Sequence, residues 1–303
     1  MAKVLVAWSS TISRRELSLP VSQPPEIQRP PNARPRGEDD LPPAPDAAEA
    51  AGIEQAQARL VELGGARRTT STELAATFLE WPGRGPAFNH ATCLRWTGDD
   101  WRHRAGEIAA RLQARGEAPC LIVSDGLASP PDLAERLASD GWFAIGHERV
   151  LWTRRAAAVP HLEGDLRLES VTTARVDEYE AVERQIFGIS EREAADRRAA
   201  LAAAIESGVV RVYLVREAGV PVATARLLVE DGLAAIHGLG VVATERRRGL
   251  GRYLTTIATR AGLALGVSLV WLSVDVENPA ARALYDGLDY RPIYDWRRFL
   301  RTG

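Results

Sequence analysis

The sequence predicts an α/β protein of the mixed α+β kind, in which helices flank a central sheet. Two patterns carry this prediction. Apolar residues recur at helical spacing after Arg252, whereas Ser268 to Val276 is an almost unbroken apolar run, typical of a strand covered on both faces. Ala218-Gly219 is a hairpin signal between two further strand-like segments. The chain has 303 residues, enough for two units that each bury a core.

Composition narrows the class of protein. The hydrophobic content of 46% is typical of globular proteins, and a formal net charge of −2 gives no global attraction to nucleic acid. No stretch has the length and apolarity of a membrane span, and Met1 to Ser9 is too short an apolar run for a secretory signal. Cys93 and Cys120 lie in apolar surroundings and predict buried thiols in a reducing compartment. We therefore expect a cytoplasmic protein without nucleic-acid or membrane partners.

Residues 1–45 differ from the rest of the chain. They hold half of the 18 prolines and few large apolar residues after Leu19. Such a segment buries too little surface to offset the entropy of ordering, so we expect a disordered Pro-rich extension, with at most a stray strand over Ala2 to Trp8.

Residues 46–155 predict a small α/β unit. Gly64-Gly65 ends its first helix, and Pro131 stands in the first turn of its last helix. The expected elements are a helix over Ala47–Leu63, a short helix or turn over Ser71–Phe78, a strand over Thr92–Trp96, a helix over Asp99–Ala114, a strand over Cys120–Ser124, a helix over Pro131–Ser139, and one or two strands within Trp142–Arg154. Five of the eight tryptophans fall in this unit, most of them for packing, with one or two available to wall a pocket.

Residues 156–303 begin with a linker to 165 and form the second unit. The expected elements are a strand over Leu166–Glu169, helices over Thr173–Phe187 and Glu191–Ser207, strands over Val209–Glu217, Val220–Val229 and His237–Val242, a helix from Arg252, a strand over Ser268–Val276, a helix over Ala280–Gly287, and one or more strands over Ile293–Leu300. The series strand, helix, strand, helix, strand occurs in both units.

The turn between the strand at His237–Val242 and the next helix is basic and contains glycines. It reads Arg246-Arg247-Arg248-Gly249-Leu250-Gly251. A helix start offers free N–H groups and a positive dipole end, which suit a pyrophosphate, and glycines let the backbone approach it. An exposed basic turn is the alternative for this hexamer alone, because short motifs match by chance. A Walker A loop is excluded, since Gly-Lys-Ser/Thr is absent from the turn, and Gly238-Leu239-Gly240 lacks the helix that a dinucleotide fingerprint needs.

A second motif follows at the next strand-to-helix junction. It reads Asn278-Pro279-Ala280-Ala281-Arg282-Ala283-Leu284-Tyr285-Asp286-Gly287-Leu288-Asp289-Tyr290. The first motif resembles the Gln/Arg-x-x-Gly-x-Gly/Ala signature of the GCN5-related N-acetyltransferases, and the second resembles their Asn-x-x-Ala-x-x-Leu-Tyr-x-x-x-Gly-Phe pattern. Asp289 and Tyr290 depart from that pattern, standing for Gly and Phe. The order of elements over 166–300 is also similar to that of the family.

This resemblance implies the fold and the cofactor half of a site. It implies a mixed, mostly antiparallel central sheet flanked by helices, complete in a C-terminal domain at 156–303. The unit at 46–155 resembles a degenerate N-terminal copy, whose acidic loop Thr97-Gly98-Asp99-Asp100 should repel a pyrophosphate. Acetyl-CoA is then the co-substrate, and no metal is expected. The residues expected to bind it are Leu239, Val241, Arg246, Arg247, Arg248, Gly249, Leu250, Gly251, Arg252 and Asn278. Arg247 and Arg248 are expected to act through their N–H groups, and Asn278 is equally suited to cap its helix.

Two residues are expected to be catalytic. The resemblance implies that Tyr285 gives a proton to the departing sulfur, for which a phenol protonated at neutral pH is suited, although packing is the alternative for a helix tyrosine. His237 is the leading base for an ammonium acceptor, against a structural role that is common for strand histidines. Glu230, Asp275 and Glu277 are weaker candidates.

The expected function is direct acetyl transfer from acetyl-CoA to an amine of a small molecule or peptide. The alternative from another class is a non-catalytic acyl-CoA-binding regulator. Transfer to a hydroxyl, or of a longer acyl chain, also stays open. The acceptor is not specified by these motifs, and both a monomer and a homodimer are compatible with them.

Overall fold

The computed structural model describes residues 42–301, apart from the side chains of Arg192 and Asp196. The extension predicted over 1–45 and the strand predicted over Ala2 to Trp8 lie outside the described residues, except that 42–45 lead without regular structure into the first helix. Within 42–301, no helix is long and apolar enough to cross a bilayer.

The N-terminal half contains three helices and five strands within the described residues. They are α1 (Ala47–Leu63), β1 (Arg67–Ser71), β2 (Ala76–Glu80), β3 (His90–Thr92), α2 (Trp101–Gln113), β4 (Cys120–Ser124), α3 (Leu133–Ser139) and β5 (Trp142–Thr153). Helix α1 begins at a capping box, in which Asp46 accepts from the N–H of Glu49 at 2.8 Å and Glu49 accepts from the N–H of Asp46 at 3.1 Å. Its predicted bounds are confirmed.

Two predictions in this half are wrong. The segment Ser71–Phe78 belongs to a β1–β2 hairpin and not to a helix or lone turn, because β-branched residues pair across it, Thr70 opposite Thr77. The strand predicted over Thr92–Trp96 is instead β3 at His90–Thr92, since the chain leaves the sheet at Cys93, whose φ is +56°. Cys93 and Cys120 are both buried free thiols.

The C-terminal half carries the remaining elements. They are β6 (Leu166–Ser170), the 3₁₀ turn η2 (Thr173–Arg175), α4 (Val176–Phe187), α5 (Glu191–Glu206), β7 (Val210–Glu217), β8 (Val220–Glu230), β9 (Leu233–Val241), the 3₁₀ turn η3 (Ala243–Glu245), α6 (Leu250–Ala264), β10 (Leu269–Asp275), α7 (Pro279–Asp286) and β11 (Arg291–Arg301). These match the predicted series to within a few residues at each end.

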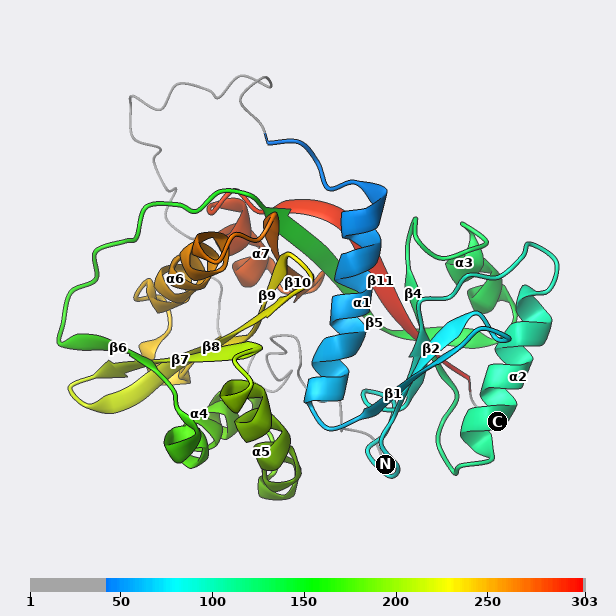
Figure 1. Ribbon diagram of the computed structural model, residues 1–303, viewed down its shortest axis with the longest axis horizontal. Coiled ribbons are helices and arrows are strands. Elements are labelled where there is room, and N and C mark those ends of the chain that lie inside the picture. The colour runs from blue at the N-terminus through cyan, green and yellow to red at the C-terminus, as the bar shows by residue number, and fades with distance from the viewer. Residues whose placement is uncertain (1–41, 302–303) are drawn as a thin grey trace, which may run out of the picture.

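All strands of the described residues form one sheet, in the order β1-β2-β3-β4-β11-β5-β10-β9-β8-β7-β6. The pairs β3–β4 and β9–β10 are parallel and the other pairs are antiparallel, so the sheet is mixed and mostly antiparallel, as predicted. The two halves exchange their last strands: β5 lies against β10, and β11 lies against β4. The exchanged strands pair with each other at the centre (Figure 1).

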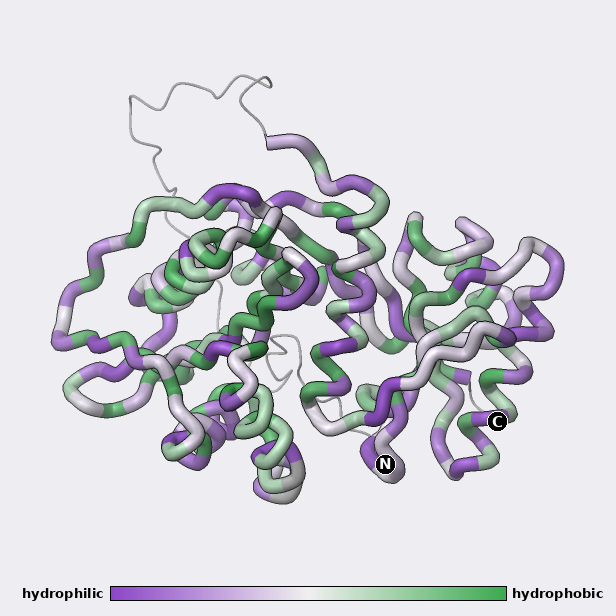
Figure 2. The backbone as a smooth tube through the Cα atoms, in the orientation of Figure 1, coloured by the Kyte–Doolittle hydropathy of each residue, from purple (hydrophilic) through white to green (hydrophobic). Residues whose placement is uncertain are grey.

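Helices cover both faces of this sheet. Helix α6 packs on β8, β9 and β10, whereas α4 packs on the other face of β8 and β9. Helix α1 starts the N-terminal half but also contacts β9, so it bridges the two halves over the middle of the sheet (Figure 1). Hydrophobic segments gather along the central strands (Figure 2). The core therefore runs through the junction between the halves.

Candidate active site

Strands β9 and β10 pair only near their starts. Residues Leu233–Ala235 face Leu269–Trp271, and no later pair joins these strands in the described sheet. Beyond this point β9 keeps its partner β8 on one side, while its other edge, from Ile236 to Val241, faces open space. Two cavities lie along this opening, one at the start of α6 and one inside the sheet.

The first cavity is a groove at the start of α6. Its walls come from the end of β9, the turn before α6, and the start of α7; they include Leu239, Val241, Arg246, Arg247, Gly249, Leu250, Gly251, Arg252 and Asn278. Ten residues were expected to bind the coenzyme, and all except Arg248 line this groove.

The turn before α6 presents main-chain N–H groups. Gly249 is the N-cap with φ +84° and supplies no side-chain cap, and Arg247 also has a positive φ of +65°. The first bond of the helix runs from the N–H of Tyr253 to the carbonyl of Gly249 at 2.9 Å. The N–H groups of residues 250–252 are therefore the free donors that a helix start leaves. Together with the helix dipole they form a binding site for an anion.

The arginines of this turn have different partners. Arg248 forms ion pairs with Glu217 and Glu245, so its side chain anchors the turn to the end of β7. Those carboxylates raise the pKa of Arg248 through hydrogen bonds and charge. Arg246 donates from Nε to the carbonyl of Val241 at 3.2 Å. Of the three consecutive arginines, Arg246 and Arg247 are thus the ones that line the groove.

Helix α7 contributes to both cavities. Asn278 caps it by accepting from the N–H of Ala281 at 3.1 Å, and the same residue lines the groove. About two turns after Asn278, Tyr285 is 6% exposed and lines the second cavity. Burial raises the pKa of Tyr285 to about 12, so its phenol is protonated at neutral pH.

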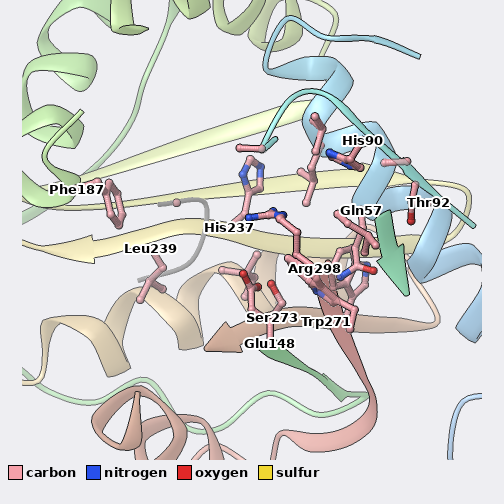
Figure 3. Close-up of a pocket in the computed structure, with 18 of the residues that line it drawn as sticks. Gln57, His90, Thr92, Glu148, Phe187, His237, Leu239, Trp271, Ser273 and Arg298 are labelled. Carbon is pink, nitrogen blue, oxygen red and sulfur yellow. The ribbon is translucent and has the colours of Figure 1, made fainter. Parts of the chain in front are cut away.

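The second cavity lies inside the sheet under α1. Phe187 and Leu239 line both cavities, which therefore adjoin each other. Figure 3 shows these two residues at one end, His237, Glu148, Ser273 and Arg298 toward the middle, and His90, Thr92 and Gln57 at the opposite end. We expected one or two tryptophans of the N-terminal half to wall a pocket. The tryptophans that line this cavity are instead Trp271 and Trp296.

His237 reaches this cavity from β9. It lies opposite Arg226 of β8, and Arg226 is held in a buried ion pair with Glu183 and by a 2.7 Å bond from its Nε to the hydroxyl of Tyr179. Burial lowers the pKa of His237 well below its ordinary value, and the charges of Arg226 and Arg197 lower it further. His237 is thus a neutral imidazole at pH 7, and a weak base.

The structure adds a carboxylate that sequence reasoning missed. Glu148 of β5 is 9% exposed, lines the cavity, and lies opposite Trp296 of β11 and Asp275 of β10. Its signal in the sequence was a charged residue inside the apolar segment Trp142–Thr153. The weaker candidates Glu230, Asp275 and Glu277 are not among the residues that line this cavity.

The loop before α2 carries an acidic side chain, whereas the turn before α6 is basic. Asp100, at the start of α2, accepts from the N–H of Thr97 at 3.1 Å. A carboxylate at this helix start opposes the binding of an anion. Over the described residues, no group of three His, Cys, Asp or Glu side chains is placed to hold a metal ion.

Comparisons with known proteins agree with this geometry. A model of the acetyltransferase (GNAT) family matches residues 172–290. Among solved structures, a GCN5-related N-acetyltransferase from Kribbella flavida superimposes with a TM-score of 0.65 at 20% identity, over 84% of this chain and 96% of that one. A tandem GNAT protein from the clavulanic acid biosynthesis pathway gives a TM-score of 0.59 at 16% identity, over 84% and 89% of the two chains. No curated protein sequence gives a significant match.

Proposed function

The chain belongs to the GCN5-related N-acetyltransferase (GNAT) superfamily, and we propose that it transfers an acetyl group from acetyl-CoA directly to an amine. One observation carries this proposal. A groove built on free main-chain N–H groups adjoins an interior polar cavity, and Phe187 and Leu239 are shared between them. A coenzyme laid along the groove would bring its reactive end to the cavity, where an acceptor could meet it.

The residues of the groove fit a diphosphate ester with a long polar arm. The N–H groups of residues 250–252 and the side chains of Arg246 and Arg252 would hold the phosphates. The unpaired edge of β9 at Leu239 and Val241 offers main-chain groups for the amides of the arm, as a sheet edge does for an added strand. Asn278 would contact this arm while it caps α7.

Acetyl-CoA would supply a thioester, an acyl group ready for attack by nitrogen. On the acceptor side, Glu148 would draw an ammonium group into the cavity and take its proton. His237 is neutral, so it would accept a hydrogen bond from the same nitrogen without repelling it. We therefore assign the base to Glu148 and an orienting role to His237. Most of the acceleration would come from holding two substrates together.

On the leaving side, Tyr285 would donate a hydrogen bond to the sulfur. With a pKa of about 12 against about 8.5 for a thiol, complete proton transfer from phenol to thiolate costs roughly 5 kcal/mol. Burial of the sulfur in the same cavity would narrow this gap, because it raises the pKa of a thiol as well. Tyr285 would therefore act mainly by stabilising the charge that develops on sulfur.

The test is a thiol-release assay with acetyl-CoA and a panel of primary amines, with calorimetric titration of acetyl-CoA run beside it. We expect Glu148→Gln to lower kcat at least 100-fold and to remove the acidic limb of the pH–rate profile, with acetyl-CoA affinity unchanged. His237→Gln, which keeps a hydrogen-bond acceptor, should lower kcat less and leave that limb in place. Equal profiles for Glu148→Gln and the wild type would refute the assignment of the base.

The same pair of measurements separates an enzyme from a regulator. Tight binding of acetyl-CoA with no thiol released by any amine would favour the regulator, and absence of binding would refute the groove itself.

A further inference from the structure

Arg298 is a cation in the interior cavity with no carboxylate partner among residues 42–301. It projects from β11, its guanidinium lies 5.4 Å from the ring of Trp296, and its buried Nε makes no hydrogen bond within the described part of the chain. The neighbouring residue Arg297 differs, because it points to the opposite face of the strand and its guanidinium donates to Asp125 at 2.6 Å. Arg298 is half-buried, so its guanidinium is partly desolvated without a carboxylate partner, and an anionic ligand would offset that cost.

The groups around Arg298 also fit an anion. Gln57 accepts from the hydroxyl of Tyr294 at 3.0 Å, which leaves its NH₂ group as a donor. The hydroxyl of Thr92 lines the same end of the cavity. Burial, helped by the charge of Arg298, lowers the pKa of His90 to about 3, so this neighbour adds no charge of its own. Two neutral donors therefore lie at the end of the cavity next to Arg298, and Glu148 is the one carboxylate among the described residues that line the cavity.

The nearest carboxylate of the cavity lies one strand away. Glu148 of β5 is opposite Trp296 of β11, so Glu148 and Arg298 are diagonal neighbours on one face of the sheet. Diagonal neighbours are separated by roughly 7–8 Å between their backbones. Both side chains line the same cavity, where one small molecule would bond Glu148 at one end and Arg298 at the other.

We propose that the acceptor is an amino acid or a similarly small amine that carries a carboxylate, bound through the carboxylate by Arg298 and through the amine by Glu148. The inference rests on the proposed function. Guanidinium and carboxylate match as a two-bond pair, which would fix the direction of the acceptor. The ammonium gives one proton to Glu148, and the free amine forms the bond to the acetyl carbon. The carbon–sulfur bond breaks and the nitrogen loses its second proton. One of these two protons ends on the sulfur, which leaves as thiol, and the other passes to solvent.

The test compares matched acceptors. Each of the common L-amino acids is assayed for thiol release beside its carboxamide and its decarboxylated amine, with the wild type, Arg298→Met, Arg298→Lys and the control Arg297→Met. For the best acid, we expect kcat/KM to exceed that of its amide at least tenfold, the equivalent of one charge-assisted hydrogen bond. Arg298→Met should bring this ratio to about one by slowing only the acid. Arg298→Lys should retain part of the ratio, and Arg297→Met all of it.

Each outcome decides the proposal. Equal or better turnover of amides and simple amines by the wild type would overturn it, whatever the variants do or however they fold. Failure of every acid in the panel while acetyl-CoA still binds would also overturn it, because the proposal names that class. Loss of acetyl-CoA binding in the wild type would instead show that the proposed function has failed. Calorimetry with acetyl-CoA and melting temperatures of all variants separate these cases.

Discussion

Replacing Gly240 by alanine should disturb the junction of the two cavities, at a position that lines the groove beside Leu239. An added Cβ would lie 2.4 Å from Cγ2 of Ile186 and 2.8 Å from Cζ of Phe187, against about 3.4 Å for an ordinary contact. The end of α4 must therefore move by about 1 Å, and Phe187 must move with it. Gly240 has no positive φ, so the effect is steric and not a matter of backbone strain.

The size of the effect follows from that displacement. A shift of about 1 Å in a wall that positions reacting groups can cost up to about 100-fold in rate, and overpacking of this kind destabilises a fold by about 1–3 kcal/mol. We expect Gly240→Ala to lower kcat by tenfold or more and to change acetyl-CoA affinity by less than that. Steady-state thiol release, calorimetry and thermal unfolding measure the three quantities.

Gly106→Ala is the matched control. Gly106 lies in α2, where an added Cβ meets nothing within 4 Å, so the same substitution should preserve activity and leave the melting temperature equal or higher. A Gly240→Ala protein with wild-type kcat and a normal melting temperature would refute the view that Phe187 sets the geometry of the junction.

Three further predictions address single groups. Tyr285→Phe should lower kcat about 10- to 100-fold, the loss of a hydrogen bond to a charged group, with little change in acetyl-CoA affinity; an unchanged kcat would make Tyr285 a packing residue. Gly249→Glu should weaken acetyl-CoA binding at least 100-fold in calorimetry, because it adds a charge of the same sign as the phosphates and a side chain at a φ of +84°. The control Gly249→Ala adds a side chain without the charge. Near-normal affinity of the Glu variant would contradict the assignment of the anion site. His90 has its pKa lowered from 6.5 to about 3, so the unfolded chain binds more protons between these values and stability falls as pH drops through that window. Going from pH 6.5 to 5 should cost about 2 kcal/mol at this residue, and denaturant unfolding of His90→Gln should show a shallower acid limb than the wild type.

Elements with local signals could be predicted from the sequence. The bounds of α1 follow from its cap at Asp46 and its end at Gly64, and β4 is an apolar run between turn residues. The hairpin at β1–β2 could not be predicted in this way, since Thr-Glu-Leu-Ala-Ala has local helix preference and only pairing across the sheet overrides it. At this hairpin, the pairing of β1 with β2 outweighs the local helix propensity.

The groove was more predictable than the cavity, for a physical reason. Its turn and helix start are contiguous in the chain, so one motif contains the anion site. The cavity is assembled from strands far apart in sequence: Glu148 and Arg298 become neighbours only through the pairing of β5 with β11. The register of such a pair depends on the whole sheet, and a charged residue inside an apolar segment does not by itself show which groups it will face. Glu148 was missed on this account.

The exchange of β5 and β11 makes the two halves mutually dependent for folding. A half made alone would leave its parallel strand pair with an open, apolar edge, which is a template for aggregation. A single proteolytic cut in the linker at 156–165 would leave two fragments that stay associated through the strand pairs β5–β10 and β4–β11. The N-terminal half is therefore a structural partner that also lends the other half a side of its cavity.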